Sequence, residues 1–137
     1  MWAQSDFCRA LVLSGGGNNG AWEAGVFYGL VNYSNPEDYA YDVITGVSAG
    51  SINTLAFSGW EKGKEIELAQ WLSDLWKDLK TENVWQDWPI GGKVAGLTTK
   101  SGAIDNSPLL NYLRGIASSF PDFKRRVTLS AVEVETG

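Results

Sequence analysis

The chain has 137 residues, of which 44% are hydrophobic and 20% charged, and its 11 basic and 16 acidic side chains give a net charge of −5. These values are typical of one globular domain and disfavour binding of nucleic acid through charge. The sequence has no histidine and a single cysteine, Cys8. Within these residues, a Ser-His-Asp triad, an internal disulfide and an HExxH zinc site are therefore excluded.

No stretch of the sequence reaches the roughly 18 apolar residues of a membrane helix. Residues 1–9 also lack the basic start and apolar run of a signal peptide. We therefore expect a soluble or peripheral protein, with an N-terminal segment over residues 1–9 and a domain over residues 10–137. The sequence does not specify a compartment.

Short apolar segments alternate with helical patterns in the first half of the chain. Ala10–Ser14 is an apolar run that ends at glycines and predicts a buried strand. A helix is predicted from about Ala21 to Val31, apolar on nearly all sides, as in a helix packed deeply against a sheet. Tyr41–Thr45 predicts a second strand, and a further helix is expected from Ser51 to Trp60.

The second half continues the alternation after a longer irregular segment. Apolar residues at helical spacing predict a helix over 63–79, whereas 80–106 is rich in glycine and is expected to be a long loop such as a lid. Ser107 followed by Pro108 predicts a helix N-cap, and 126–133 predicts a third strand. This order favours a three-layer α/β sandwich with a mostly parallel sheet.

A glycine-rich loop, Gly15–Gly20, follows the first predicted strand and matches G-x-G-x-x-G. Such a loop directs backbone N–H groups toward one point beside a helix N-terminus, where a phosphate or an oxyanion can bind. Dinucleotide binding would need an acid at the end of the second strand. Asp38 and Asp42 have suitable spacing, but Asp42 begins that strand, so a nucleotide-binding module stays the less favoured alternative.

A second motif, Gly46–Gly50, matches the G-x-S-x-G of a nucleophile elbow, with Ser48 between a predicted strand and a predicted helix. Parallel neighbouring strands place both loops at the same edge of the sheet. This arrangement favours acyl transfer, with Ser48 attacking an ester carbonyl and the N–H groups of the glycine loop stabilising the oxyanion. The plainer alternative is that Ser48 is only a small turn residue or a helix cap.

At these residues the sequence resembles the patatin-like phospholipase family, and the resemblance extends from about residue 10 to the end. It depends on Leu11–Val26, Ile44–Asn53, Ile104–Leu109 and Val127–Gly137. The family consists of lipid acyl hydrolases that use a Ser-Asp dyad without a catalytic histidine. The resemblance therefore implies a three-layer α/β fold and an acyl ester of a glycerolipid or phospholipid as substrate, with no metal and no cofactor.

The resemblance also assigns roles to individual residues. Ser48 is the expected nucleophile. The expected oxyanion hole consists of Gly15, Gly16, Gly17 and Asn18, and the residues expected to support the two motifs are Asn19, Gly20, Gly46 and Gly50.

Two departures from the family pattern affect these expectations. Position 19 is usually Arg or Lys in the family, and here it is Asn19. The family's base is an Asp in an Asp-Gly turn after the third strand, and no Asp-Gly dipeptide occurs in this chain. We therefore expect residues 1–137 to be the N-terminal part of a truncated patatin-like domain, with little activity alone. An inactive fragment or pseudoenzyme is the alternative.

A lipid hydrolase must reach its substrate at an interface. Trp85 and Trp88, near Ile90 in the predicted loop, are candidates for transient contact with a membrane or a lipid droplet. The alternative is that both indoles pack against the core.

Overall fold

The computed structural model describes residues 8–100 and 102–132, which fall into two units. One unit contains residues 8–77 and 121–132, and the other contains residues 78–120 except for position 101. Most of the predicted N-terminal segment and the Thr-Gly end of the chain lie outside the described residues.

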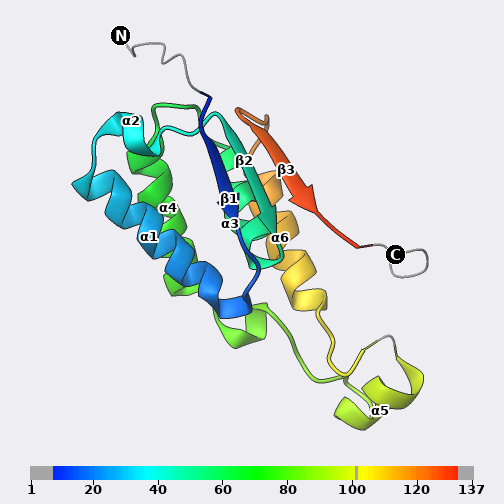
Figure 1. Ribbon diagram of the computed structural model, residues 1–137. Helices are drawn as coiled ribbons and strands as arrows, with labels where there is room; N and C mark the ends of the chain where they lie inside the picture. The colour runs from blue at the N-terminus through cyan, green and yellow to red at the C-terminus, as the bar shows by residue number, and fades with distance from the viewer. Residues whose placement is uncertain (1–7, 101, 133–137) are drawn as a thin grey trace. The chain divides into compact units, whose positions relative to one another are not determined.

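The first unit contains a parallel sheet with helices packed beside it (Figure 1). Its strands are β1 (Ala10–Leu13), β2 (Val43–Val47) and β3 (Arg126–Ser130), in the order β1-β2-β3. Gly46 of β2 pairs with Leu13 of β1 on one side and with Leu129 of β3 on the other. The predicted α/β class with a parallel sheet is therefore confirmed. The second strand begins and ends two residues later than expected, because Gly46 and Val47 continue the pairing with β3.

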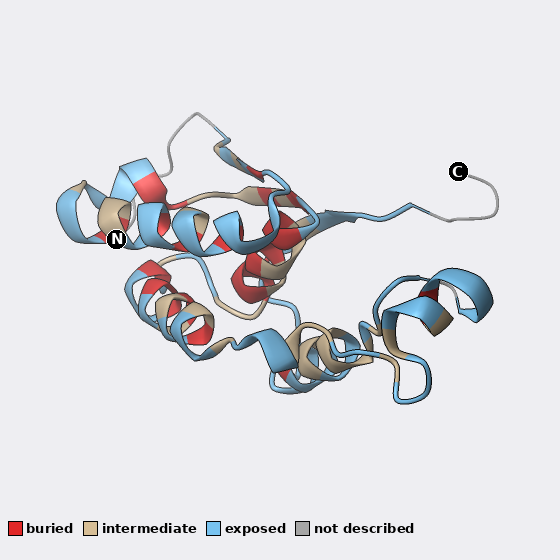
Figure 2. Cartoon of the chain, turned by 90° about the horizontal axis from the view of Figure 1, so that it is seen from below, coloured by how far each residue is buried: buried red, intermediate tan, exposed pale blue. Residues whose placement is uncertain are grey.

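Helices α1 (Gly20–Tyr33), α3 (Ala49–Ser58) and α4 (Glu65–Asp78) accompany the sheet, and the short α2 (Pro36–Tyr39) follows α1. Helix α3 packs against all three strands, and α1 packs against α3. Figure 2 shows the buried residues gathered where the sheet and these helices meet. The buried core includes Leu13, Ala24, Phe27, Ile44, Ala56, Phe57, Leu68 and Leu72, with the rings of Phe27 and Phe57 4.6 Å apart.

Helix α1 differs from the deeply packed helix that its composition predicts. Its buried residues, Gly20, Ala24, Phe27 and Val31, form a single stripe, whereas Trp22 is 71% exposed. The helix packs against α2 and α3 and lies beside the sheet (Figure 1). The apolar composition of α1 therefore did not predict how much of the helix is buried.

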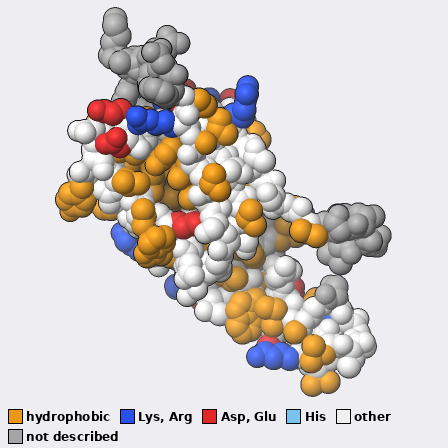
Figure 3. Space-filling model, in the orientation of Figure 1, with side chains coloured by type: hydrophobic (Ala, Val, Ile, Leu, Met, Phe, Trp, Pro, Cys, Tyr) orange, Lys and Arg blue, Asp and Glu red, His pale blue; other side chains and the backbone are white. Residues whose placement is uncertain are grey.

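The two faces of the sheet are unequal. Alternation along the strands directs Leu13 and Ile44 toward α3, and both are buried. On the opposite face Val12 is 74% exposed, and Val47 is 49% exposed. Figure 3 shows hydrophobic side chains at the surface on the side of the molecule that it displays.

The second unit contains more regular structure than its glycine content predicts. It holds a short 3-10 helix (Thr81–Asn83), α5 (Gly92–Thr99) and α6 (Ser107–Ser118), and an isolated bridge pairs Gln86 with Asp105. The prediction of a continuous loop over 80–106 is therefore wrong.

Two details of the second unit concern its helices α5 and α6. A Cβ on Gly96 would lie only 2.5 Å from the Ala103 carbonyl oxygen, so this glycine permits close packing on the following segment. The predicted cap is also displaced, because Ser107 is the first helical residue of α6 and Asn106 occupies the cap position.

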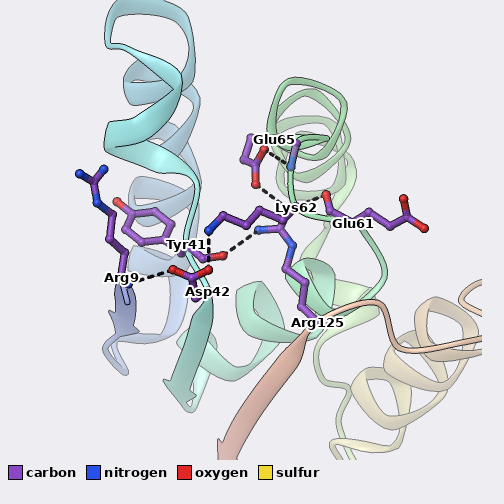
Figure 4. A network of polar contacts seen from close by, with 8 residues as sticks. Arg9, Tyr41, Asp42, Glu61, Lys62, Glu65 and Arg125 are labelled. Carbon is purple, nitrogen blue, oxygen red and sulfur yellow. Dashed lines mark hydrogen bonds and ion pairs between the residues drawn. The ribbon is translucent and has the colours of Figure 1, made fainter. Parts of the chain in front are cut away.

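A buried ion pair holds the amino-terminal end of β3 (Figure 4). The guanidinium of Arg125 donates to the carbonyl oxygens of Trp60 and Glu61 at 2.8 and 2.7 Å, and to Glu65 at 2.6 Å. The second carboxylate oxygen of Glu65 accepts the Gly63 N–H at 2.8 Å. The side chains of Arg125 and Glu65 are 3% and 1% exposed, so the pair fixes β3 to the segment between α3 and α4.

We expect the substitution Glu65→Ala to lower the free energy of unfolding by about 3–5 kcal/mol, because it leaves the Arg125 charge buried without its partner. Glu67→Ala is the matched control, since Glu67 lies on the same helix as Glu65 and forms an exposed pair with Lys64 just before it, and we expect a change of about 0–1 kcal/mol. Urea unfolding measures both values. Equal effects of the two substitutions would contradict a structural role for the buried pair.

Candidate active site

The turn between β2 and α3 holds Ser48 in an uncommon backbone conformation. Strand β2 ends at Val47, α3 begins at Ala49, and Ser48 between them has φ 53° and ψ −122°. Glycine adopts this region readily, whereas a residue with a Cβ is strained there at a cost of about 1–3 kcal/mol. Ser48 is exposed and lies at the carboxyl end of the central strand.

The two glycines of this motif allow the close approach of three backbone segments. A Cβ on Gly46 would lie 2.3 Å from the carbonyl oxygen of Gly50. A Cβ on Gly50 would lie 2.5 Å from the Leu13 carbonyl oxygen at the end of β1. Both distances are far below van der Waals contact, so neither position accepts a side chain without displacing the backbone.

The glycine loop begins directly beside Ser48. A Cβ on Gly15 would lie 3.2 Å from the Ser48 Cβ and 3.9 Å from its Oγ. Gly16 has φ 162° and ψ 16°, and Gly17, with φ 59°, begins a 3-10 helix that ends at Asn19. Among the described residues, we find no protein acceptor for the N–H groups of Gly16 and Gly17. The structure thus brings the two predicted motifs together at one edge of the sheet.

The remaining predicted loop residues have separate places. Asn18 is exposed within the 3-10 helix. The backbone N–H of Asn19 donates to the Gly16 carbonyl at 3.1 Å, and its side-chain amide lies beside Gly16. Gly20 is buried, and a Cβ there would lie 2.4 Å from the ring of Trp76.

A hydrogen-bonded group that sequence reasoning missed connects the loop to its surroundings; we call it the Glu23 network. One Glu23 oxygen accepts the N–H and the hydroxyl of Ser14, at 2.8 and 3.1 Å. The side-chain amide of Asn53 donates to the other Glu23 oxygen at 3.1 Å and to the Gly20 carbonyl at 3.0 Å. The indole of Trp76 donates to the Asn53 oxygen at 2.7 Å.

One residue in the sequence could have indicated this network. Asn53 is a polar residue in a helix whose neighbours are mostly apolar, and it is only 1% exposed. Buried amides require hydrogen-bond partners. Sequence spacing alone did not indicate that those partners come from α1 and α4.

No carboxylate in the described part of the chain forms a hydrogen bond with Ser48. Asp105 instead accepts from Gln86 at 2.8 Å and from the backbone of Ser107 at 2.9 Å, and the Gln86 bond is the main cause of its lowered pKa. Within the described residues, no group of three His, Cys, Asp or Glu side chains is arranged to hold a metal ion.

The acids considered for a dinucleotide site lie elsewhere. Asp42 precedes β2, at the end of the strand opposite to Ser48, where it pairs with Lys62 (Figure 4). The pKa of Asp42 is lowered first by the hydrogen bond from the Arg9 N–H and then by Lys62. Asp38 accepts the backbone N–H of Asn35 at 3.3 Å, so neither acid is placed to bind a ribose beside the glycine loop.

These features define a parallel α/β protein with a serine at a strained strand-to-helix turn, facing a glycine loop. The family model of the patatin-like phospholipases matches residues 11–135, which is most of the chain. The protein therefore belongs to the patatin-like phospholipase family, a family of lipid acyl hydrolases. Comparison with curated proteins and with solved structures gives no significant match.

The family match agrees with the resemblance seen in the sequence. It indicates a hydrolase of lipid metabolism. Among the described residues, none of the helices has the length and apolar character needed to cross a bilayer. The predicted domain boundary at residue 10 stays a prediction.

The conformation of Ser48 leads to a stability prediction. We expect Ser48→Gly to raise the free energy of unfolding by about 1 kcal/mol, because relief of the strained φ exceeds the added entropy of the unfolded chain. Ser48→Ala keeps the Cβ and serves as the control, with a change near zero. Chemical denaturation compares the two variants, and a glycine variant less stable than the alanine variant would contradict the strain.

Proposed function

We propose that this protein hydrolyses acyl esters of glycerolipids or phospholipids with Ser48 as the nucleophile. The observation that carries the proposal is the approach of Gly15 to Ser48, which places a donor-rich loop beside an exposed hydroxyl. The backbone N–H groups of Gly15–Asn18 then stabilise the oxyanion that forms when Ser48 Oγ attacks the ester carbonyl. Loss of one such donor costs about 10²–10³ in kcat.

The reaction proceeds through an acyl-enzyme. The Ser48 oxygen bonds to the carbonyl carbon, its proton passes to a base, and the alcohol portion of the lipid leaves with a proton. Water then attacks the acyl-serine, which releases the fatty acid and restores the hydroxyl. We propose that the base is an aspartate contributed from outside residues 1–137, since the sequence has no Asp-Gly dipeptide of the kind that carries the family's base.

A catalytically inactive relative is the second candidate. It is favoured by one observation, the absence of an Asp-Gly dipeptide from the 137 residues. In that case the elbow and the loop persist without chemistry. The two candidates differ in whether Ser48 reacts with an electrophile that requires an activated serine.

Labelling with a fluorophosphonate probe distinguishes these candidates. We expect the probe to modify Ser48 slowly in the 137-residue chain and about 10²–10⁴-fold faster in the reading frame continued beyond Gly137, which would supply the base. Ser48→Ala should abolish labelling and esterase activity. Ser118→Ala, which removes an exposed serine of α6, should change neither. Labelling that persists in Ser48→Ala would exclude Ser48 as the nucleophile.

The contacts of Trp85 and Trp88 bear on their proposed role at a lipid surface. The indoles of Trp85 and Trp88 are half-buried, with Lys93 5.7 Å from one ring and Lys100 5.3 Å from the other. The N–H of Trp88 also donates to the Gly102 carbonyl at 2.9 Å. These rings are therefore held within their own unit.

Helix α5 offers a more exposed apolar surface than these two indoles. Ile90 before the helix is 85% exposed, and Val94 and Leu97 on it are 72% and 77% exposed. The segment 88–104 carries two lysines and no acid, although the whole chain has a net charge of −5. An apolar helix face bordered by lysines suits an interface with anionic lipid. We propose that Ile90, Val94 and Leu97 contact the lipid surface that holds the substrate.

Vesicle sedimentation tests this contact. We expect Val94→Ser/Leu97→Ser to weaken binding to phosphatidylcholine vesicles containing phosphatidylserine by about tenfold or more, because less apolar area enters the interface. Tyr33→Ser is the control, since Tyr33 is 91% exposed in the other unit. Equal binding by the wild type and the α5 variant would exclude this surface.

A further inference from the structure

The Glu23 network connects the start of the glycine loop to the helix that follows Ser48. We infer that Glu23, Asn53 and Trp76 are positioning residues that hold this loop at a fixed distance from the Ser48 hydroxyl. The inference depends on the proposed function, because it concerns the accuracy with which the oxyanion donors face the nucleophile. None of these three residues is assigned to contact the substrate.

Glu23 closes the glycine loop on itself. It lies in the first turn of α1, three residues after the loop, and one of its oxygens accepts both polar hydrogens of Ser14, directly before the loop. The residues between them contain three consecutive glycines, which have the greatest backbone freedom. A single carboxylate therefore limits the motion of a segment that has little intrinsic rigidity.

Asn53 connects the closed loop to the elbow. It lies on α3, one turn after Ser48, and its amide donates to Glu23 and to the carbonyl of Gly20. Since Ser48 directly precedes α3, a shift of the loop relative to the nucleophile would have to stretch both of these bonds. The 1% exposure of Asn53 keeps water from replacing them.

Trp76 fixes the orientation of the Asn53 amide. An indole N–H can only donate, so the atom that accepts it at 2.7 Å must be the amide oxygen. The amide NH₂ is then directed toward Gly20 and Glu23, both of which offer acceptors. The indole ring also fills the space beside Gly20 that a Cβ would occupy. Each donor in the network thus has one assigned acceptor.

Substitutions that change donors into acceptors test this order of bonds. Asn53→Asp places a second carboxylate beside Glu23, and Glu23→Gln places a second NH₂ beside Asn53. The double variant Glu23→Gln/Asn53→Asp reverses the polarity of that contact and restores a donor to face an acceptor. The carbonyl of Gly20 stays without its donor, so recovery should be partial.

The readout is the rate constant for fluorophosphonate modification of Ser48, separated from probe affinity. We expect Asn53→Asp to lower the maximal rate by about tenfold to a hundredfold, because displaced donors stabilise the oxyanion less. Probe affinity should change little, and the double variant should recover part of the rate. The control Asn32→Asp, at an exposed asparagine of α1 that donates to the Tyr28 carbonyl, should leave the rate unchanged.

Amide hydrogen exchange gives a readout that does not require chemistry. We expect the Ser14 N–H to exchange about tenfold faster in Glu23→Ala, since its charged acceptor is lost. Trp76→Phe keeps an aromatic ring and removes only the donor, so it tests the network if Asn53→Asp fails to fold.

The outcomes separate the two proposals. Unchanged Ser14 exchange in Glu23→Ala would overturn the positioning role, whatever the activity. If Asn53→Asp, Glu23→Gln and the double variant all lowered the modification rate equally, the positioning role would also be overturned. Partial recovery in the double variant is expected only if a donor must face an acceptor at the contact between residues 23 and 53. Absence of any Ser48 modification in the wild-type reading frame continued beyond Gly137 would instead contradict the proposed function.

Discussion

The carbonyl oxygen of Leu13 leaves no room for a side chain at Gly50, and this contact determines the geometry of the candidate site. It brings the start of α3 against the last residue of β1. The chain that leaves β1 must then pass beside the residue that precedes α3. Gly15 and Ser48 are therefore neighbours, because the backbones at the end of β1 and the start of α3 meet without a side chain between them.

The two ends of the sheet are stabilised by different interactions. At the carboxyl end, glycines permit close backbone contact. The strained backbone of Ser48 lowers the stability of the fold there. At the amino end, Arg125 and Glu65 form a buried pair whose hydrogen bonds are satisfied by backbone groups. Such a pair resists separation more than it adds net stability.

The sequence predicts those parts of the protein that depend on local pattern. The strands, the two glycine motifs and the position of Ser48 follow from residues adjacent in the chain, and the structure places them at one edge of the sheet. The exposure of Trp22 and the helix around Gly96 do not follow from it, because both depend on distant packing. The partners of Asn53 come from α1 and α4, so spacing within α3 gives no indication of them.

The uncovered face of the sheet has a consequence for the behaviour of the protein in solution. Parallel sheets are usually covered on both faces, yet Val12 and Val47 are exposed here. Within the described residues, β1 and β3 each pair only with β2, so both outer strands present unpaired backbone groups. Apolar surface next to open strand edges promotes self-association. We therefore expect residues 8–77 and 121–132 to self-associate as the protein concentration rises.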